Sequence, residues 1–254
     1  NYVSFALSST LLGPWLVKRP DAIFAYHPPL TVGLPAYVLS RLWRVPFVYQ
    51  IQDMWPESLS ASGMLNNPRI LAWVGSFADL VYRWAAAICV ISPGFRQNLL
   101  SKGVPAEKIH VISNWVDTGT YYPAEPDEVL AARLELAGYF NVMYAGNIGQ
   151  GQGLETLLEA AHILRDIPEI QFVIVGDGVA LPTLQQVTQT KGLTNVRFLG
   201  SYPTADMPAL YALAEVLLVH LRDDPLYRIT IPHKVFSYMA SGKPILVAVA
   251  GDAA

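Results

Sequence analysis

The chain has 254 residues, of which 52% are hydrophobic and 15% are charged. The formal net charge is -3, from 17 basic and 20 acidic residues, so no global positive field points to nucleic acid as a partner. A single cysteine, Cys89, excludes a disulfide within the chain and fits a reducing compartment. The composition predicts a globular protein with a large buried core.

The first residues, NYVSFALSSTLLGPWLV, are apolar and follow a helical pattern. Gly13 and Pro14 interrupt them before they reach the roughly 18 apolar residues that a membrane span needs. The chain starts without a methionine inside this pattern and stops at VAVAGDAA, directly after an apparent strand. We expect it to be a piece of a longer protein, cut at both ends.

Short apolar runs alternate with stretches of helical length along the whole chain. Runs without strict polar alternation, separated by helices, indicate parallel sheets with helices packed on them. The longer helical stretches include 152–166 and 178–191. The expected strands are 22–26, 46–51, 87–91, 108–112, 141–145, 170–175, 195–199, 215–220 and 244–249.

One connection between these elements differs from the others: the stretch TGTYYPAEPDE, which contains glycine, proline and acidic residues. We interpret 119–127 as a hinge between a partial first domain, 1–118, and a partial second domain, 128–254. The prediction is an α/β protein with two doubly wound, Rossmann-like parallel-sheet domains that face each other across a cleft. Ligands in such sheets gather beyond the carboxyl ends of the strands.

Glycine-rich tails follow three expected strands of the second domain. YAGNIGQGQG contains Gly146 and Gly149, VGDG contains Gly176 and Gly178, and NVRFLG contains Phe198. Glycine lets the backbone approach a ligand closely, and the N–H groups of a following helix favour a diphosphate. The spacing differs from the dinucleotide G-x-G-x-x-G, so a nicotinamide cofactor is not indicated. A nucleotide lying across the three strand ends explains all three tails, whereas tight turns are the structural alternative.

A lysine in the stretch IPHKVFSYMASGKPIL suggests an anion site. Lys234 falls in the first turn of an expected helix, where its charge opposes the helix dipole. A docked anion would remove that mismatch, and an ordinary surface lysine is the alternative.

In the first half, His27 and Asp53 follow two expected neighbouring strands. Adjacent parallel strands would bring both side chains to one rim, where they could bond a sugar hydroxyl. A structural histidine is the alternative. The sequence contains no C-x-x-C or H-x-x-x-H metal pattern, no G-x-S-x-G elbow and no P-loop.

Taken together and in order, seven stretches resemble the family 4 glycosyltransferases of the two-Rossmann GT-B type. HPPLTVGLPA and NWVD favour the bacterial exopolysaccharide and O-antigen branch, which includes colanic-acid-type fucosyltransferases and N-acetylfucosaminyltransferases. The stretches are YHPPL, QIQDMWPESL, VISPGFRQNLLSKGVPAEKIHVISNWVD, YAGNIGQGQGLETLLEAA, VGDG, NVRFLG and IPHKVFSYMASGKPIL.

The resemblance implies a retaining transfer of a sugar from a nucleoside diphosphate sugar to a hydroxyl, without a metal or another cofactor. The acceptor domain comes first in this family and the donor domain second. Enzymes of this branch usually extend a polyprenyl-diphosphate-linked saccharide, which implies a cytoplasmic protein with a peripheral contact to the inner membrane.

The resemblance also assigns roles to single residues. His27 matches a histidine beside the transferred sugar, and Asp53 matches an acidic position at the next strand end. Gly146 matches the glycine that faces the diphosphate, Phe198 the segment against which the base rests, and Lys234 a group that neutralises the leaving diphosphate.

The chain departs from the family at the donor side. The two glutamates that often frame the donor fall at Ile229 and Ser237, and a common basic pair is replaced by Asn147 and Gln152. Ser237 could still bond a ribose hydroxyl, and Arg228 could share the phosphate charge. The catalytic candidates are His27 and Asp53, and the donor-binding candidates are Gly146, Asn147, Gly149, Gly176, Gly178, Phe198, Arg228, Lys234 and Ser237.

Two other functions stay open at this point. The missing glutamates are compatible with a nucleotide-sugar-binding module that has lost catalysis, and a GT-B sugar-nucleotide 2-epimerase would share much of the pattern. The sequence fixes neither the donor sugar and nucleobase, nor the acceptor and linkage, nor the oligomeric state.

Overall fold

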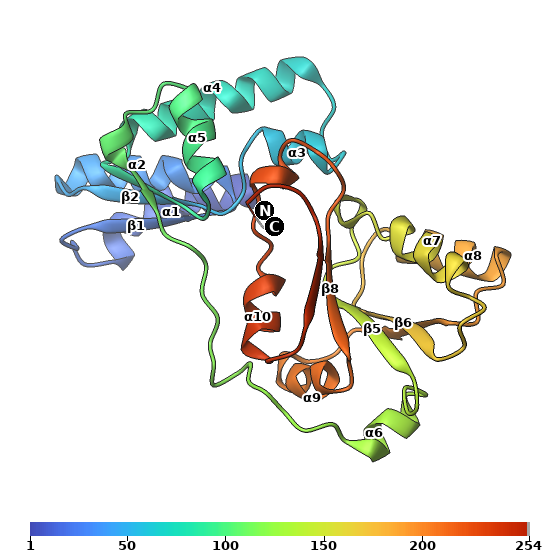
Figure 1. Ribbon diagram of the computed structural model, residues 1–254. Helices are drawn as coiled ribbons and strands as arrows, with labels where there is room; N and C mark the ends of the chain where they lie inside the picture. Colours follow the sequence, from blue (N-terminus) through green and yellow to red (C-terminus); the bar gives the residue numbers. More distant parts are fainter. Residues whose placement is uncertain (253–254) are drawn as a thin grey trace. The chain divides into compact units, whose positions relative to one another are not determined.

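The computed structural model describes residues 1–252, which form two compact units (Figure 1). The first unit is Asn1–Ser113 with the short segment Arg228–Thr230, and the second is Asn114–Tyr227 with the chain from Ile231 onward. Each unit is built on a parallel β-sheet, which confirms the predicted α/β class. Residues 119–127 group with the second unit, and their role as a hinge stays a prediction.

The first unit carries a four-stranded sheet in the order β1-β2-β3-β4. His27, the last residue of β1, pairs with Ile51, the last residue of β2, so the two strands end side by side. The strands are β1 (Ile23–His27), β2 (Phe47–Ile51), β3 (Ala87–Val90) and β4 (Ile109–Val111). The helices are α1 (Tyr2–Leu16), α2 (Gly33–Trp43), α3 (Glu57–Ala61), α4 (Pro68–Trp84) and α5 (Pro93–Ser101), with 3-10 turns η1 (Leu30–Val32) and η2 (Ala106–Lys108).

Local sequence signals set the starts of α4 and α5. The Asn67 side chain accepts a hydrogen bond from the backbone N–H of Arg69 at 3.0 Å, and the Ser92 hydroxyl accepts one from Phe95 at 3.0 Å. Each cap is followed by a proline at the first helical position, where no N–H is needed. These caps satisfy N–H groups that would otherwise lack partners.

The apolar helix α1 is largely exposed, with Trp15 at 87%. Within residues 1–252, none of the helices combines the length and the apolar character needed to cross a bilayer.

The second unit carries a five-stranded sheet in the order β7-β6-β5-β8-β9. The strands are β5 (Phe140–Ala145), β6 (Ile170–Val175), β7 (Val196–Gly200), β8 (Val216–His220) and β9 (Ile245–Ala248). The helices are α6 (Glu128–Arg133), α7 (Glu155–Ile163), α8 (Leu181–Thr190), α9 (Met207–Ala212) and α10 (Lys234–Ala240), with 3-10 turns η3 (Gln150–Gln152), η4 (Thr204–Asp206) and η5 (Tyr227–Ile229).

Side chains alternate between two buried clusters, one on each face of this sheet. Tyr144 and Ile174 point into the cluster that α7 and α8 cover, whereas Met143 and Val173 point into the cluster that contains residues of α9 and α10. Figure 1 shows α7 and α8 together on one side of β5 and β6. After β5, the chain adds β6 and then β7 on one side of β5, and it later adds β8 on the opposite side of β5. Such a reversal creates a crevice at the carboxyl ends of the strands.

All nine expected strands are present, and their ends differ from the predicted ends by no more than one residue. The helix expected over 152–166 is shorter than predicted. Residues Gln150–Gln152 instead form a 3-10 turn, and Gly153 adopts a left-handed conformation with a φ of 59° before α7 begins at Glu155. The glycine therefore separates the strand-end loop from the helix.

Candidate donor site

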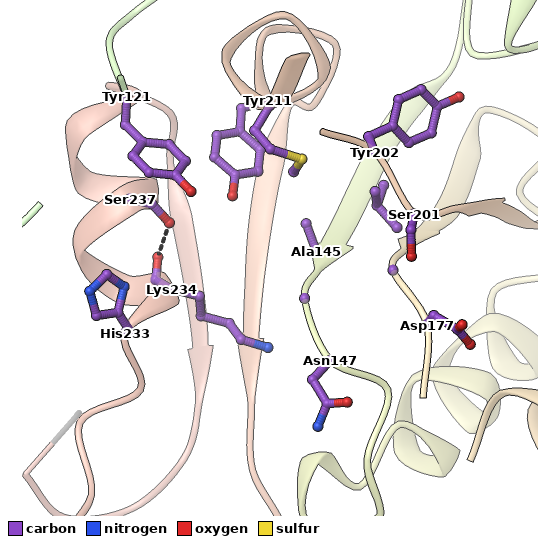
Figure 2. Close-up of a pocket in the computed structure, with 14 residues that line it drawn as sticks. Tyr121, Ala145, Asn147, Asp177, Ser201, Tyr202, Tyr211, His233, Lys234 and Ser237 are labelled. Carbon is purple, nitrogen blue, oxygen red and sulfur yellow. Dashed lines mark hydrogen bonds between the residues drawn. The ribbon is translucent and has the colours of Figure 1, made fainter. Parts of the chain in front are cut away.

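A pocket of about 440 Å³ lies at the carboxyl ends of β5 and β6 in the second unit. Figure 2 shows Lys234 and Ser237 on one side, Asn147 below, and Asp177 and Tyr202 on the other side. The pocket is lined by Tyr121, Ala145, Gly146, Asn147, Val175, Gly176, Asp177, Ser201, Tyr202, Met207, Tyr211, His233, Lys234 and Ser237. It therefore occupies the crevice where ligands bind in doubly wound sheets.

Backbone hydrogen bonds join the loops that form the floor of this pocket. The Gly146 N–H donates to the Val175 carbonyl at 2.9 Å, and the Gly176 N–H donates to the Gly200 carbonyl at 2.8 Å. The Ile148 N–H donates to the Asp177 carbonyl at 2.8 Å. The sheet ladder thus continues past the strands, and the three tails form one surface.

Close approach of these loops explains two of the glycines. Gly176 has a φ of 132° and Gly178 a φ of 155°. A side chain at 176 would overlap the carbonyl oxygen of Gly146, and one at 178 would overlap the carbonyl oxygen of Ile148. Loop packing alone therefore demands glycine at both positions, in addition to any need of a ligand.

Lys234 begins α10, and its side chain extends into the pocket (Figure 2). Its Nζ atom lies 3.7 Å from the centroid of the Tyr144 ring and donates a hydrogen bond to Gln152 Oε1 at 2.9 Å. A Cβ atom placed on Gly146 would lie 3.2 Å from the same Nζ atom. The ammonium therefore sits directly beside the glycine turn that ends β5.

The Tyr144 side chain that supports Lys234 is fully buried. Its hydroxyl lies 2.6 Å from the Asn147 carbonyl oxygen and 2.9 Å from Gln152 Oε1. Because the ring is pinned at its hydroxyl end, its face is presented to Nζ in a fixed orientation. Burial lowers the pKa of Lys234 from 10.5 to about 7.

Ser237 lies one turn further along α10 and is also buried. Its hydroxyl donates to the Lys234 carbonyl at 3.0 Å, and Tyr211 lines the same pocket. Tyr211 in turn stacks on Tyr121, with the ring centroids 6.2 Å apart. Hydroxyl-bearing side chains thus occupy the position at which the resemblance predicts a carboxylate.

The pocket brings together five of the nine predicted donor-binding residues: Gly146, Asn147, Gly176, Lys234 and Ser237. Gly149, Gly178, Phe198 and Arg228 do not line it. The Phe198 side chain packs against the buried cluster under α7 and α8, because its place on β7 points it to that face of the sheet. Ser201 and Tyr202, which follow β7, line the pocket instead.

Arg228 lies on the short turn η5, in the segment that groups with the first unit. The neighbouring Ile229 is held there by its carbonyl oxygen, which accepts a hydrogen bond from Ser92 Oγ at 2.5 Å. The phosphate contact that the sequence predicts for Arg228 stays a prediction.

The two catalytic candidates lie in the first unit, after adjacent strands. His27 is almost fully buried, and its ring makes edge contacts with Tyr49 and Trp55 at centroid distances of 5.9 and 5.5 Å. Its Nδ1 atom is buried and has no hydrogen-bond partner within the described chain. Burial lowers the pKa of His27 from 6.5 to about 3, so the imidazole is neutral at physiological pH.

Asp53 follows β2 on an exposed part of the loop. Neighbouring protein atoms remove some of the water around its carboxyl group, and this desolvation raises the pKa of Asp53. The catalytic roles of both residues stay predictions. Among residues 1–252, no three His, Cys, Asp or Glu side chains gather closely enough to hold a metal ion.

Sequence reasoning missed the aromatic residues of the pocket. Tyr144 lies inside an apolar strand, where it looks like an ordinary core residue, and Tyr211 lies in the short helix α9. Tyr202 directly follows a glycine-rich strand end, so its position was a usable signal. The sequence pattern marks Gln152 only as a replacement for a basic residue.

Two family models match the chain, one in each half. Residues 3–115 match the Glycosyl transferase 4-like domain, and residues 139–254 match the Glycosyl transferases group 1 domain.

Curated relatives agree with both models. The chain is 30% identical to the putative colanic acid biosynthesis glycosyl transferase WcaI of Escherichia coli, over 85% of this chain and 54% of WcaI. It is 25% identical to the probable glycosyltransferase WbjE of Pseudomonas aeruginosa, over 90% of this chain and 57% of WbjE. The chain therefore spans about half the length of the curated relatives it matches.

Solved structures show the same fold. HepE of Anabaena in complex with UDP superimposes with a TM-score of 0.75 at 22% identity, over 99% of this chain and 64% of HepE. Sucrose-phosphate synthase of Thermosynechococcus elongatus superimposes with a TM-score of 0.69 at 18% identity, over 97% of this chain and 60% of the synthase. With a 4-like domain in its first half and a group 1 domain in its second, the chain belongs to the family 4 glycosyltransferases of the GT-B fold.

Proposed function

We propose that the pocket of the second unit binds the diphosphate of a nucleotide sugar and that the full-length protein transfers the sugar to a hydroxyl of an acceptor. The observation that carries this proposal is the position of Lys234. Its ammonium group lies beside the Gly146 turn, at the end of β5, where the strand order of the sheet reverses. A diphosphate bound there can contact both the positive charge and the exposed backbone.

The names of the similar proteins support this donor class. HepE of Anabaena was crystallised with UDP, with UDP and glucose, and with UDP-glucose. The putative transferase WcaI is named for colanic acid biosynthesis. We propose that the reaction retains the anomeric configuration, needs no metal, and extends a lipid-linked saccharide in cell-surface polysaccharide assembly at the cytoplasmic face of the membrane.

A panel of UDP, GDP, ADP and dTDP sugars tests the donor step. Calorimetry on this chain should detect binding of at least one nucleotide sugar, and Lys191→Ala, a change of an exposed lysine of the same unit, should leave that binding intact. The full-length protein should release the nucleoside diphosphate only when a lipid-linked saccharide is added. Failure of every nucleotide sugar to bind would contradict the proposal.

The same assay separates the other functions. A 2-epimerase would interconvert nucleotide sugars without an acceptor, and a module without catalysis would bind a donor and never release its nucleoside diphosphate. Of these two alternatives, the absence of carboxylates at positions 229 and 237 favours the module without catalysis. A transfer activity that survives treatment with a chelator would support the metal-independent reaction. An activity that the chelator abolishes and that added Mg²⁺ restores would contradict it.

A further inference from the structure

Two side chains from one segment of the chain meet around the Lys234 ammonium, which comes from another segment. Tyr144 presents its ring face at 3.7 Å, and Gln152 presents Oε1 at 2.9 Å. Both come from the segment that ends β5 and turns toward α7, whereas Lys234 comes from α10, more than 80 residues later, as the separation of 82 positions from Gln152 shows. The arrangement fixes the ammonium in place before any ligand arrives.

We propose that Tyr144 and Gln152 are positioning residues that hold Lys234 as the anion-sensing group of the pocket, so that binding of a donor diphosphate draws a proton from solvent onto Lys234. This inference rests on the proposed donor-binding function and names how the pocket responds to the diphosphate.

The chemistry of the two supports explains this behaviour. An aromatic face and an amide oxygen stabilise an ammonium group only partly, because neither carries a full negative charge. The ammonium is largely removed from water, and desolvation is the cause that lowers the pKa of Lys234 to about 7. A diphosphate at the Gly146 turn would supply the missing negative charge and restore the protonated form.

The surrounding groups offer few competing sources of charge. Tyr144 lies under Nζ, and His220 lies behind Gln152, with its Nδ1 atom 2.6 Å from the Gln152 carbonyl oxygen. Asp177 lies across the pocket and is exposed, with Oδ1 accepting a hydrogen bond from the Gly178 N–H at 2.7 Å. The titratable side chains that line the pocket with Lys234 are Tyr121, Asp177, Tyr202, Tyr211 and His233.

The position of Lys234 can be measured without any donor. An NMR titration of the lysine ε-CH2 signals, with the Lys234 signal assigned by Lys234→Arg, should give a pKa near 7 in the wild-type chain. Gln152→Glu should raise this pKa because a carboxylate replaces the amide, and Gln152→Leu should lower it further because the acceptor is lost. Gln189→Glu, on the exposed side of α8, adds the same charge elsewhere and should leave the titration unchanged.

The second measurement is the dependence on pH of the affinity for a donor, namely the UDP, GDP, ADP or dTDP hexose that binds best. A diphosphate esterified at both ends keeps its charge between pH 6 and 9, so a change in affinity reports on the protein. If Lys234 titrates near 7 when the pocket is free, the affinity should fall by about 30-fold from pH 6 to pH 8.5. Gln152→Glu should reduce this change to less than about threefold, and should weaken binding at pH 6 because the carboxylate already neutralises the ammonium.

Each result decides between the two proposals. An unchanged Lys234 titration in Gln152→Glu would overturn the positioning role while donor binding persists. An affinity that does not depend on pH would overturn the proton uptake. Binding of no nucleotide sugar would overturn the donor function and the anion-sensing role together. Because an imidazole also lines the pocket, His233→Gln is included, and a flat pH profile in that variant would assign the effect to His233 instead.

Discussion

The Tyr238 hydroxyl bonds both backbone groups of Ala145: it accepts from the Ala145 N–H at 2.8 Å and donates to the Ala145 carbonyl at 3.0 Å. The ladder between β5 and β8 pairs Val142 and Met143 but does not extend to Ala145. A side chain of α10 therefore replaces the missing strand partner and anchors the helix that carries Lys234 to the residue before Gly146.

Removing this hydroxyl should destabilise the second unit. Tyr238→Phe leaves a buried N–H and a buried carbonyl without partners, which costs about 1–3 kcal/mol for each group left unsatisfied. Urea unfolding of the variant should show a correspondingly lower free energy of unfolding. Tyr122→Phe, at an exposed tyrosine, is the matched control and should stay within about 0.5 kcal/mol of the wild type. Equal stability of the two variants would show that the Ala145 contacts contribute nothing.

The contact between the first two glycine loops gives a second prediction. Gly176→Ala places a methyl group against the Gly146 carbonyl oxygen, and it also forces alanine into a φ of 132°. Gly192→Ala measures a left-handed backbone without any overlap, because Gly192 has a φ of 61° and no atom near the added methyl. Gly192→Ala should cost about 1–2 kcal/mol from the backbone alone, and Gly176→Ala about 1–3 kcal/mol more, from the overlap and from a φ that residues with a side chain adopt even less readily. Equal losses in thermal or urea unfolding would exclude the overlap.

The sequence predicted the strands and the edge of the sheet at which the site lies, because both follow from local patterns. Apolar runs of strand length with glycine at their ends occur at β5, β6 and β7, and parallel pairing brings those ends together. Lys234 was predicted for a related reason, since a lysine at a helix start is electrostatically unusual.

Side-chain direction and long-range packing could not be predicted in the same way. Phe198 and Tyr202 are only four positions apart, yet Phe198 packs into the core and Tyr202 lines the pocket. Tyr121 and Tyr211 lie far apart in sequence, yet they stack on each other and both line the pocket, which is a consequence of long-range packing rather than of their neighbours in sequence. Gly176 and Gly178 looked like ligand contacts, although the adjoining loop already requires them.

Lys234→Ala should weaken the binding of a nucleotide sugar by about 1.5–3 kcal/mol, the value of a hydrogen bond to a charged group. Calorimetry at pH 6 is the appropriate measurement, because a pKa of about 7 leaves Lys234 mostly protonated there even in the free pocket. Lys191→Ala is the control for removal of one positive charge from the same unit. If both variants bind as the wild type does, Lys234 does not contact the diphosphate.

His27 should make the first unit sensitive to acid. The folded chain holds its pKa at about 3, whereas the ordinary value is 6.5, so between these values the unfolded chain binds a proton that the folded chain does not. Stability should therefore fall as the pH drops below 6.5, by at most about 1.4 kcal/mol per pH unit from this group. His27→Asn should flatten the dependence of urea unfolding on pH, and His110→Asn, at an exposed edge-strand residue, should retain it. Wild-type acid sensitivity in His27→Asn would assign it to other groups.

His27 should also separate turnover from donor binding. The proposed role is a hydrogen bond to the transferred sugar, whereas the diphosphate pocket lies in the other unit. In the full-length protein, His27→Asn should therefore lower kcat by an amount that corresponds to about 0.5–1.5 kcal/mol, the value of one neutral hydrogen bond. Nucleoside diphosphate affinity, measured by calorimetry, should stay unchanged. A variant with full turnover and normal folding would show that the buried imidazole serves only the packing around Tyr49 and Trp55.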